Sequence, residues 1–118
     1  MMTIKDISRS LLQNNDEWKV LFFDFVDEFR KSKDLTQIQE EPLKGIPQNL
    51  RSLLASIVEA LCHETSVEIP KWCFKIGPLS RPWFVSGIEN LKATALVESP
   101  AWFKKRNIFV LGNFLQRA

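Results

Sequence analysis

The chain of 118 residues contains few of the residues that build metal and redox sites: two cysteines and one histidine. Cys62 and Cys73 have ten residues between them, and no second pair of cysteines completes a zinc site. Cys62 lies in an apolar helical pattern and Cys73 lies between Trp72 and Phe74, where a free thiol commonly serves as a small apolar side chain. We therefore expect two buried thiols, no metal and no other cofactor.

Glycine is also scarce, with four in the chain, and the glycine-rich signatures that bind phosphate are absent, as is H-E-x-x-H. Any serine triad would need His63 as its base, and the nucleophile elbow G-x-S-x-G is missing. Cys62 cannot easily use its neighbour His63, because adjacent helical residues point about 100° apart. We expect His63 to interact with the carbonyls at the end of its helix, and we expect the protein not to be an enzyme.

Long apolar runs are missing as well. The longest strongly apolar stretch, residues 20–23, is broken by Asp24, and residues 1–10 have no apolar secretory core. We therefore expect neither export nor a membrane span, and we place the protein in the cytoplasm.

What the chain does contain is the composition of an ordinary globular protein, with 45% hydrophobic and 25% charged residues. Its length suits one domain, residues 1–118, that buries its core without disulfides. Residues 1–59 carry 8 basic and 10 acidic side chains, whereas residues 60–118 carry 8 and 4, so the halves have charges of −2 and +4. The simplest explanation is a chance scatter of solvated charges; otherwise an anionic partner would bind the C-terminal half.

Two segments, residues 16–33 and 47–64, have the periodicity of long amphipathic helices, and we expect them to pair in the core. Asn14 or Asn15 can cap the first, and Pro47 suits the first turn of the second. The small residues on the polar side of the second helix leave room for another helix. The two apolar stripes consist of Trp18, Leu21, Phe22, Phe25, Val26 and Phe29, and of Leu50, Leu53, Leu54, Ile57, Val58 and Leu61.

The first long helix has two further features. Val20 and Phe23 lie off its main stripe, so its apolar face is unusually broad. Core packing is the favoured interpretation, and the alternative is that part of this face meets another helix or a second subunit in a homodimer. Asp24, Asp27 and Glu28 share one face, where they bind a cation or a basic partner or form a solvated surface. The solvated surface is the favoured interpretation.

The rest of the chain predicts shorter elements around these two helices. We expect a helix near residues 4–12, a connection at 35–45 and an extended connector near residues 66–80, with helical spacing again from Pro82 to Ala95. Ser99 and Pro100 resemble the N-cap and first turn of a short helix, and a further helix is considered for the end of the chain. The predicted fold class is therefore all-α, a single-domain helical bundle of about four to six helices.

Aromatic and basic residues are densest at residues 100–110, PAWFKKRNIFV, and residues 81–84 repeat the combination. Such residues can hold phosphates and stack on bases. The favoured alternative is a short helix that packs its aromatic rings inward while its cations complement the helix dipole. If the two segments meet in space, the candidate partner-binding residues are Arg81, Trp83, Trp102, Lys104, Lys105 and Arg106.

The sequences IPKW, RPWF and ESPAWFKKRNIFVLGNFLQRA, in that order, give residues 69–118 a resemblance to a family. They resemble the C-terminal region of small uncharacterised bacterial proteins associated with toxin-antitoxin genes or helix-turn-helix regulators. The resemblance implies an antitoxin-like or regulatory accessory role. The N-terminal half lacks a recognisable helix-turn-helix, because the turn between its long helices is too long and contains proline.

We therefore predict a protein-interaction or regulatory accessory module whose partner is another protein. The alternative is a nucleic-acid-associated regulator that uses a basic aromatic C-terminal surface, with Lys92 as a further cation. A metal-dependent enzyme built on the Asp24, Asp27 and Glu28 cluster is the third hypothesis.

Overall fold

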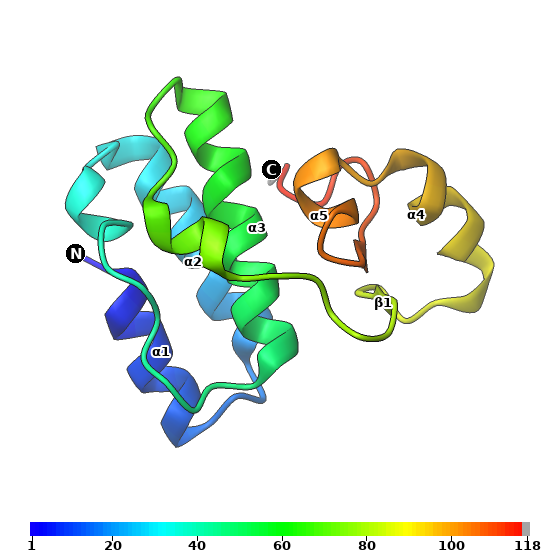
Figure 1. Cartoon of the computed structure of the whole chain (residues 1–118), viewed down its shortest axis with the longest axis horizontal. Helices are drawn as coiled ribbons and strands as arrows, with labels where there is room; N and C mark the ends of the chain where they lie inside the picture. Colours follow the sequence, from blue (N-terminus) through cyan, green and yellow to red (C-terminus); the bar gives the residue numbers. More distant parts are fainter. Residues whose placement is uncertain (117–118) are drawn as a thin grey trace.

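Five α-helices dominate the computed structural model, which describes residues 1–116 (Figure 1). The α-helices are α1 (Ile4–Gln13), α2 (Trp18–Ser32), α3 (Gln48–Thr65), α4 (Lys92–Glu98) and α5 (Ala101–Lys104). The 3₁₀ helices are η1 (Leu35–Gln37), η2 (Lys71–Lys75) and η3 (Glu89–Leu91), and the two strands are β1 (Trp83–Phe84) and β2 (Ile108–Phe109). The predicted helical fold class is confirmed, with one very small parallel sheet added to it.

The N-terminal half is a bundle of α1, α2 and α3. A capping box starts α1, because the Thr3 hydroxyl accepts from the amide of Asp6 and the Asp6 carboxylate accepts from the amide of Thr3, both at 3.1 Å. The Arg30 guanidinium at the C-terminal end of α2 forms a two-pronged ion pair with Glu64 at the end of α3, at 2.9 and 2.8 Å. Figure 1 shows α3 between α1 and α2 on one side and α4 and α5 on the other.

Apolar side chains of α2 and α3 form the centre of the core, as the two stripes predict. Phe22, Phe25 and Phe29 are buried on α2, and Leu53, Leu54, Ile57 and Leu61 are buried on α3. The opposite side of α3 is buried too, because α5 packs against it and Arg106, just after α5, contacts Ser56 and Glu59. The prediction that small residues let another helix approach α3 is therefore confirmed, and α3 is enclosed on nearly all sides.

The broad apolar face of α2 is only partly covered. Phe23 packs against Phe114 with ring centroids 5.3 Å apart, so a C-terminal segment of the same chain covers it. Val20 stays 58% exposed. A homodimer through this face stays a prediction. In residues 1–116, no helix is long and apolar enough to cross a membrane.

The helix predicted from Pro82 onward is wrong in its first part. Residues 83–84 form β1, and the amides of Trp83 and Val85 donate to the carbonyls of Asn107 and Phe109 at 3.0 and 3.1 Å. Gly87 then turns the chain with φ of 68°, which leaves only residues 92–98 for α4. The partner strand lies 25 positions later in the chain, so local spacing does not reveal it.

Several expected helix ends are also wrong. Asn14 is the C-cap of α1, while Glu17 precedes α2 without a side-chain cap. Ser99 is the C-cap of α4, and Pro100 takes the N-cap of α5. The Ser99 hydroxyl does not cap α5, because it accepts a hydrogen bond from the amide of Val110 and donates one to the carbonyl of Ile108.

The connector at residues 66–80 contains the 3₁₀ helix η2 rather than the short strand that its alternation allowed. After α5, the described residues form β2 and turns instead of the further helix considered for the end of the chain. Residues 117 and 118, which belong to the predicted domain and to the family resemblance, lie outside the described residues.

Both thiols are buried, as predicted, and this has a consequence that depends on pH. Burial raises the pKa of Cys62 to about 11 and that of Cys73 to about 12, with the Glu59 carboxylate contributing to both. At pH 8 we expect neither thiol to react with Ellman's reagent in the native protein, and both to react in denaturant.

The thiols of the unfolded chain ionise at a lower pH than those of the native protein. The free energy of unfolding should therefore fall as the pH rises above about 9. Rapid labelling of the native thiols at pH 8 would contradict the burial.

Candidate functional site

The two segments that combine aromatic and basic residues do meet in space. The amide of Leu79 donates to the carbonyl of Arg106 at 3.0 Å, and the amide of Trp83 donates to the carbonyl of Asn107 at 3.0 Å. The Asn107 side chain returns a hydrogen bond to the carbonyl of Leu79 at 3.1 Å. The backbone of residues 79–85 therefore lies along residues 106–109.

The side chains of these segments nevertheless point to different neighbours. The Trp83 ring packs against Trp18 at the start of α2, with centroids 5.6 Å apart. The Trp102 ring packs against His63 at the end of α3, with centroids 5.3 Å apart. Because each tryptophan covers a different helix, the two rings do not build one stacking platform for bases.

Arg106 lies in the interior, which corrects the expectation that it belongs to an exposed binding surface. Its side chain is paired with the buried carboxylate of Glu59, and the residue is only 2% exposed. The guanidinium also donates to the Cys73 carbonyl at 2.7 Å and to the Ile76 carbonyl at 3.0 Å, both in or next to η2. A weaker contact reaches the Ser56 hydroxyl at 3.3 Å. Arg106 thus connects α3, η2 and the segment after α5.

The second cation on Glu59 is Lys105. Its ammonium pairs with the free carboxylate oxygen of Glu59 and lies 5.6 Å from the centre of the Trp102 ring. A carboxylate in the interior is costly unless opposite charges and hydrogen bonds surround it. Of the six candidate partner-binding residues, Arg106 is therefore buried inside the fold, while Lys105 pairs with Glu59 but keeps 44% of its side chain exposed. Arg81 and Lys104 remain exposed.

The acidic face of α2 is not assembled as a metal site. Glu28 accepts hydrogen bonds from the amide of Met2 at 2.5 Å and from the Gln37 side chain at 3.0 Å, while Asp24 faces solvent. Across residues 1–116, no group of three or more His, Cys, Asp or Glu side chains could hold a metal ion.

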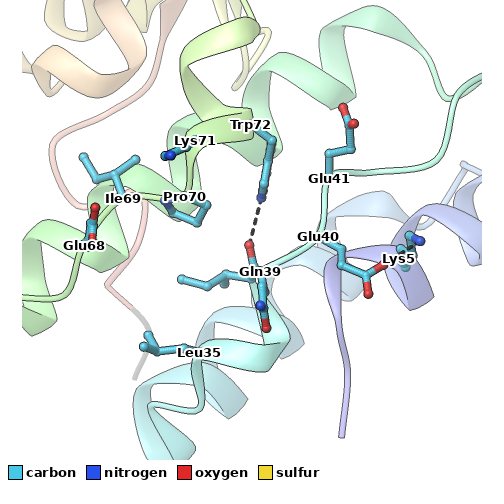
Figure 2. Close-up of a pocket in the computed structure, with 11 residues that line it drawn as sticks. Lys5, Leu35, Gln39, Glu40, Glu41, Glu68, Ile69, Pro70, Lys71 and Trp72 are labelled. Carbon is cyan, nitrogen blue, oxygen red and sulfur yellow. Dashed lines mark hydrogen bonds and ion pairs between the residues drawn. The ribbon is translucent and has the colours of Figure 1, made fainter.

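A groove that the sequence did not indicate lies between residues 35–41 and residues 68–72 (Figure 2). We call it the Trp72 groove. Its volume is about 740 Å³, within the range of about 300 to 1,000 Å³ that is typical of ligand pockets. Its apolar lining comes from Leu35, Ile38, Ile69, Pro70 and Trp72.

Two short 3₁₀ helices position the walls of the Trp72 groove. The Asp34 carboxylate caps η1 by accepting hydrogen bonds from the hydroxyl of Thr36 at 2.7 Å and from its amide at 3.0 Å, and these two bonds lower the pKa of Asp34. Pro70 precedes η2 with the extended backbone that proline favours. The two walls are joined where the Trp72 indole donates to the Ile38 carbonyl at 2.8 Å, the dashed line in Figure 2.

Charged side chains surround the apolar lining. The Lys5 ammonium pairs with the Glu40 carboxylate at 2.5 Å, so these two charges neutralise each other. Glu41 and Glu68 are exposed, and neither has an ion-pair partner within the described part of the chain. Lys71 is the remaining cation of the lining. The Trp72 groove therefore combines an apolar floor with a slight excess of negative charge.

The sequence signals of this groove are weak because both walls lie in segments predicted as connections. Trp72 and Ile38 are 34 residues apart, so neither helical nor strand periodicity relates them. A proline-bounded tryptophan in a connector, as in IPKW, is the one local hint that the segment is ordered.

We expect Arg106→Leu to lower the free energy of unfolding by about 3 to 5 kcal/mol, because it leaves the buried Glu59 carboxylate with only Lys105. Urea denaturation followed by circular dichroism measures this. The exposed Arg81→Leu variant is the control, and its cost should stay within about 0.5 kcal/mol. Equal stability of the two variants would show that the buried pair contributes little.

Comparisons with protein-family models, with curated proteins and with solved structures found no match to this chain.

Proposed function

We propose that this protein is an interaction module that docks a segment of a partner protein in the Trp72 groove. The observation that carries the proposal is the groove itself, with its volume of about 740 Å³ and its aromatic and aliphatic lining. Leu35 lies at the edge of the groove and is 51% exposed, although burial of a leucine side chain is energetically favourable. A partner that covers Leu35 would supply that burial.

A protein segment fits this lining better than a nucleic acid does. Nucleic-acid sites collect cations against phosphate, whereas this groove has three carboxylates, Glu40, Glu41 and Glu68, beside two lysines. On the C-terminal side, Lys105 and Arg106 already neutralise Glu59, and Lys92 is paired with Glu89 at 2.9 Å. Phosphate binding at Lys105 or Arg106 would compete with their contacts to the buried Glu59 carboxylate. We therefore favour a protein partner over the nucleic-acid alternative.

A regulatory accessory role, antitoxin-like in kind, is compatible with such a module and stays a prediction. It requires that the docked segment belong to a protein whose activity changes on binding. Homodimerisation through α2 would use Val20 on α2 and leave the Trp72 groove available, since Val20 is not part of its lining.

The proposal is tested by comparing two leucine variants in a tagged pull-down from cells that naturally express the chain. Leu35→Gln removes an apolar side chain at the groove, and Leu12→Gln makes the same change at a residue with 49% exposure on α1, outside the groove lining. We expect a protein partner that binds the wild type and the Leu12 variant equally. Recovery with the Leu35 variant should fall about tenfold, equivalent to about 1.4 kcal/mol.

The control measurements are the melting temperature of each variant and the ratio of absorbance at 260 and 280 nm of the eluate. Both variants should have the same melting temperature as the wild type, because the two leucines are half exposed. Nucleic acid that co-elutes at low salt and is lost at moderate salt, without a protein band, would replace the proposal by the nucleic-acid alternative. A protein band that is insensitive to Leu35→Gln would exclude the Trp72 groove as the docking site.

A further inference from the structure

The charges around the Trp72 groove indicate the chemistry of its partner. Figure 2 shows Glu68 on one side of the groove and Glu40 and Glu41 on the other, with the apolar lining between them. Carboxylates therefore flank the apolar floor at both ends. A docked segment would place its own side chains near each of these groups.

The carboxylates differ in how far they are already satisfied. Glu40 is held by Lys5, whereas Glu41 and Glu68 have no ion-pair partner in residues 1–116. Lys71 is the one cation of the lining that is not engaged in this way. The chain as a whole has a net charge of +2, so this local excess of negative charge runs against the overall balance. It is a property of the groove rather than of the molecule.

We infer that the groove selects a protein segment whose apolar side chains fill the floor and whose lysine or arginine side chains flank them on both sides. The inference rests on the proposed function and names the partner chemistry of the same site. Leu35, Ile69 and Pro70 provide most of the apolar contacts, since Trp72 is only 5% exposed, while Glu41 and Glu68 receive the flanking cations. An acidic segment would bring its carboxylates close to these two, and repulsion of like charges would disfavour it.

The strength of this selection follows from the exposure of the two carboxylates. Ion pairs at exposed positions contribute little individually, and salt screens them. The apolar floor is therefore expected to supply most of the affinity, and the flanking charges to supply the preference between segments of similar apolar content. Removing either carboxylate should weaken binding about threefold, and removing both should weaken it about tenfold.

The probe for this inference is a random library of 12-residue peptides displayed on phage, selected against the immobilised full chain. Peptides that survive are synthesised, and their affinities are measured by fluorescence polarisation at about 50 and 300 mM salt. The variants are Glu41→Gln, Glu68→Gln and the double variant, with Glu17→Gln as the matched control because Glu17 is also exposed but lies outside the groove. Leu35→Gln identifies which peptides occupy the Trp72 groove.

The expected result is that peptides sensitive to Leu35→Gln carry an apolar centre between lysine or arginine residues. Their affinity should fall in the glutamate variants and at the higher salt concentration, and Glu17→Gln should leave it unchanged. Groove-binding peptides that are neutral or acidic, or that ignore both glutamate variants, would overturn this inference while leaving the proposed docking function intact. If no selected peptide is sensitive to Leu35→Gln, the docking function and this inference both fail.

Discussion

The ion pair between Glu59 and Arg106 is the interaction on which the C-terminal half of the fold depends. Glu59 lies in the middle of the buried surface of α3, where a carboxylate is stable only with opposite charges around it. Arg106 supplies one such charge and simultaneously holds the carbonyls of Cys73 and Ile76. One residue thereby fixes three segments that are far apart in the sequence, and Lys105 completes the neutralisation of the carboxylate.

This interaction also reaches the candidate binding site. Cys73, whose carbonyl Arg106 holds, is next to Trp72 in η2, and the Trp72 indole in turn holds the wall that contains Ile38. The buried ion pair and the Trp72 groove therefore both involve residues of the same short helix, η2. Such an arrangement gives a surface groove a wall anchored in the interior, which limits the cost of ordering that wall when a partner docks.

The helical half of the fold could be predicted from the sequence because its information is local. The stripes of α2 and α3 repeat every three or four residues, and the thiol of Cys62 lies within one of them. The pairing of Trp83 with Ile108, the burial of Arg106 and the groove could not be predicted in this way, because each depends on residues 25 to 47 positions apart. The sequence drew attention to Arg106 because it is a cation beside aromatic residues. Its counterion, Glu59, lies in a helix that periodicity presents as a simple core element.

The enclosure of α3 has a consequence for how the chain acquires its structure. Residues 50–61 of α3 are translated well before Phe103 and Arg106, which cover one side of that helix. During synthesis, an isolated pair of α2 and α3 would therefore expose the Glu59 carboxylate and the small residues of α3 to solvent. The native packing of α3 forms only when residues distant in the sequence reach it. Completion of the packing around α3 therefore depends on residues that follow the long connector after this helix.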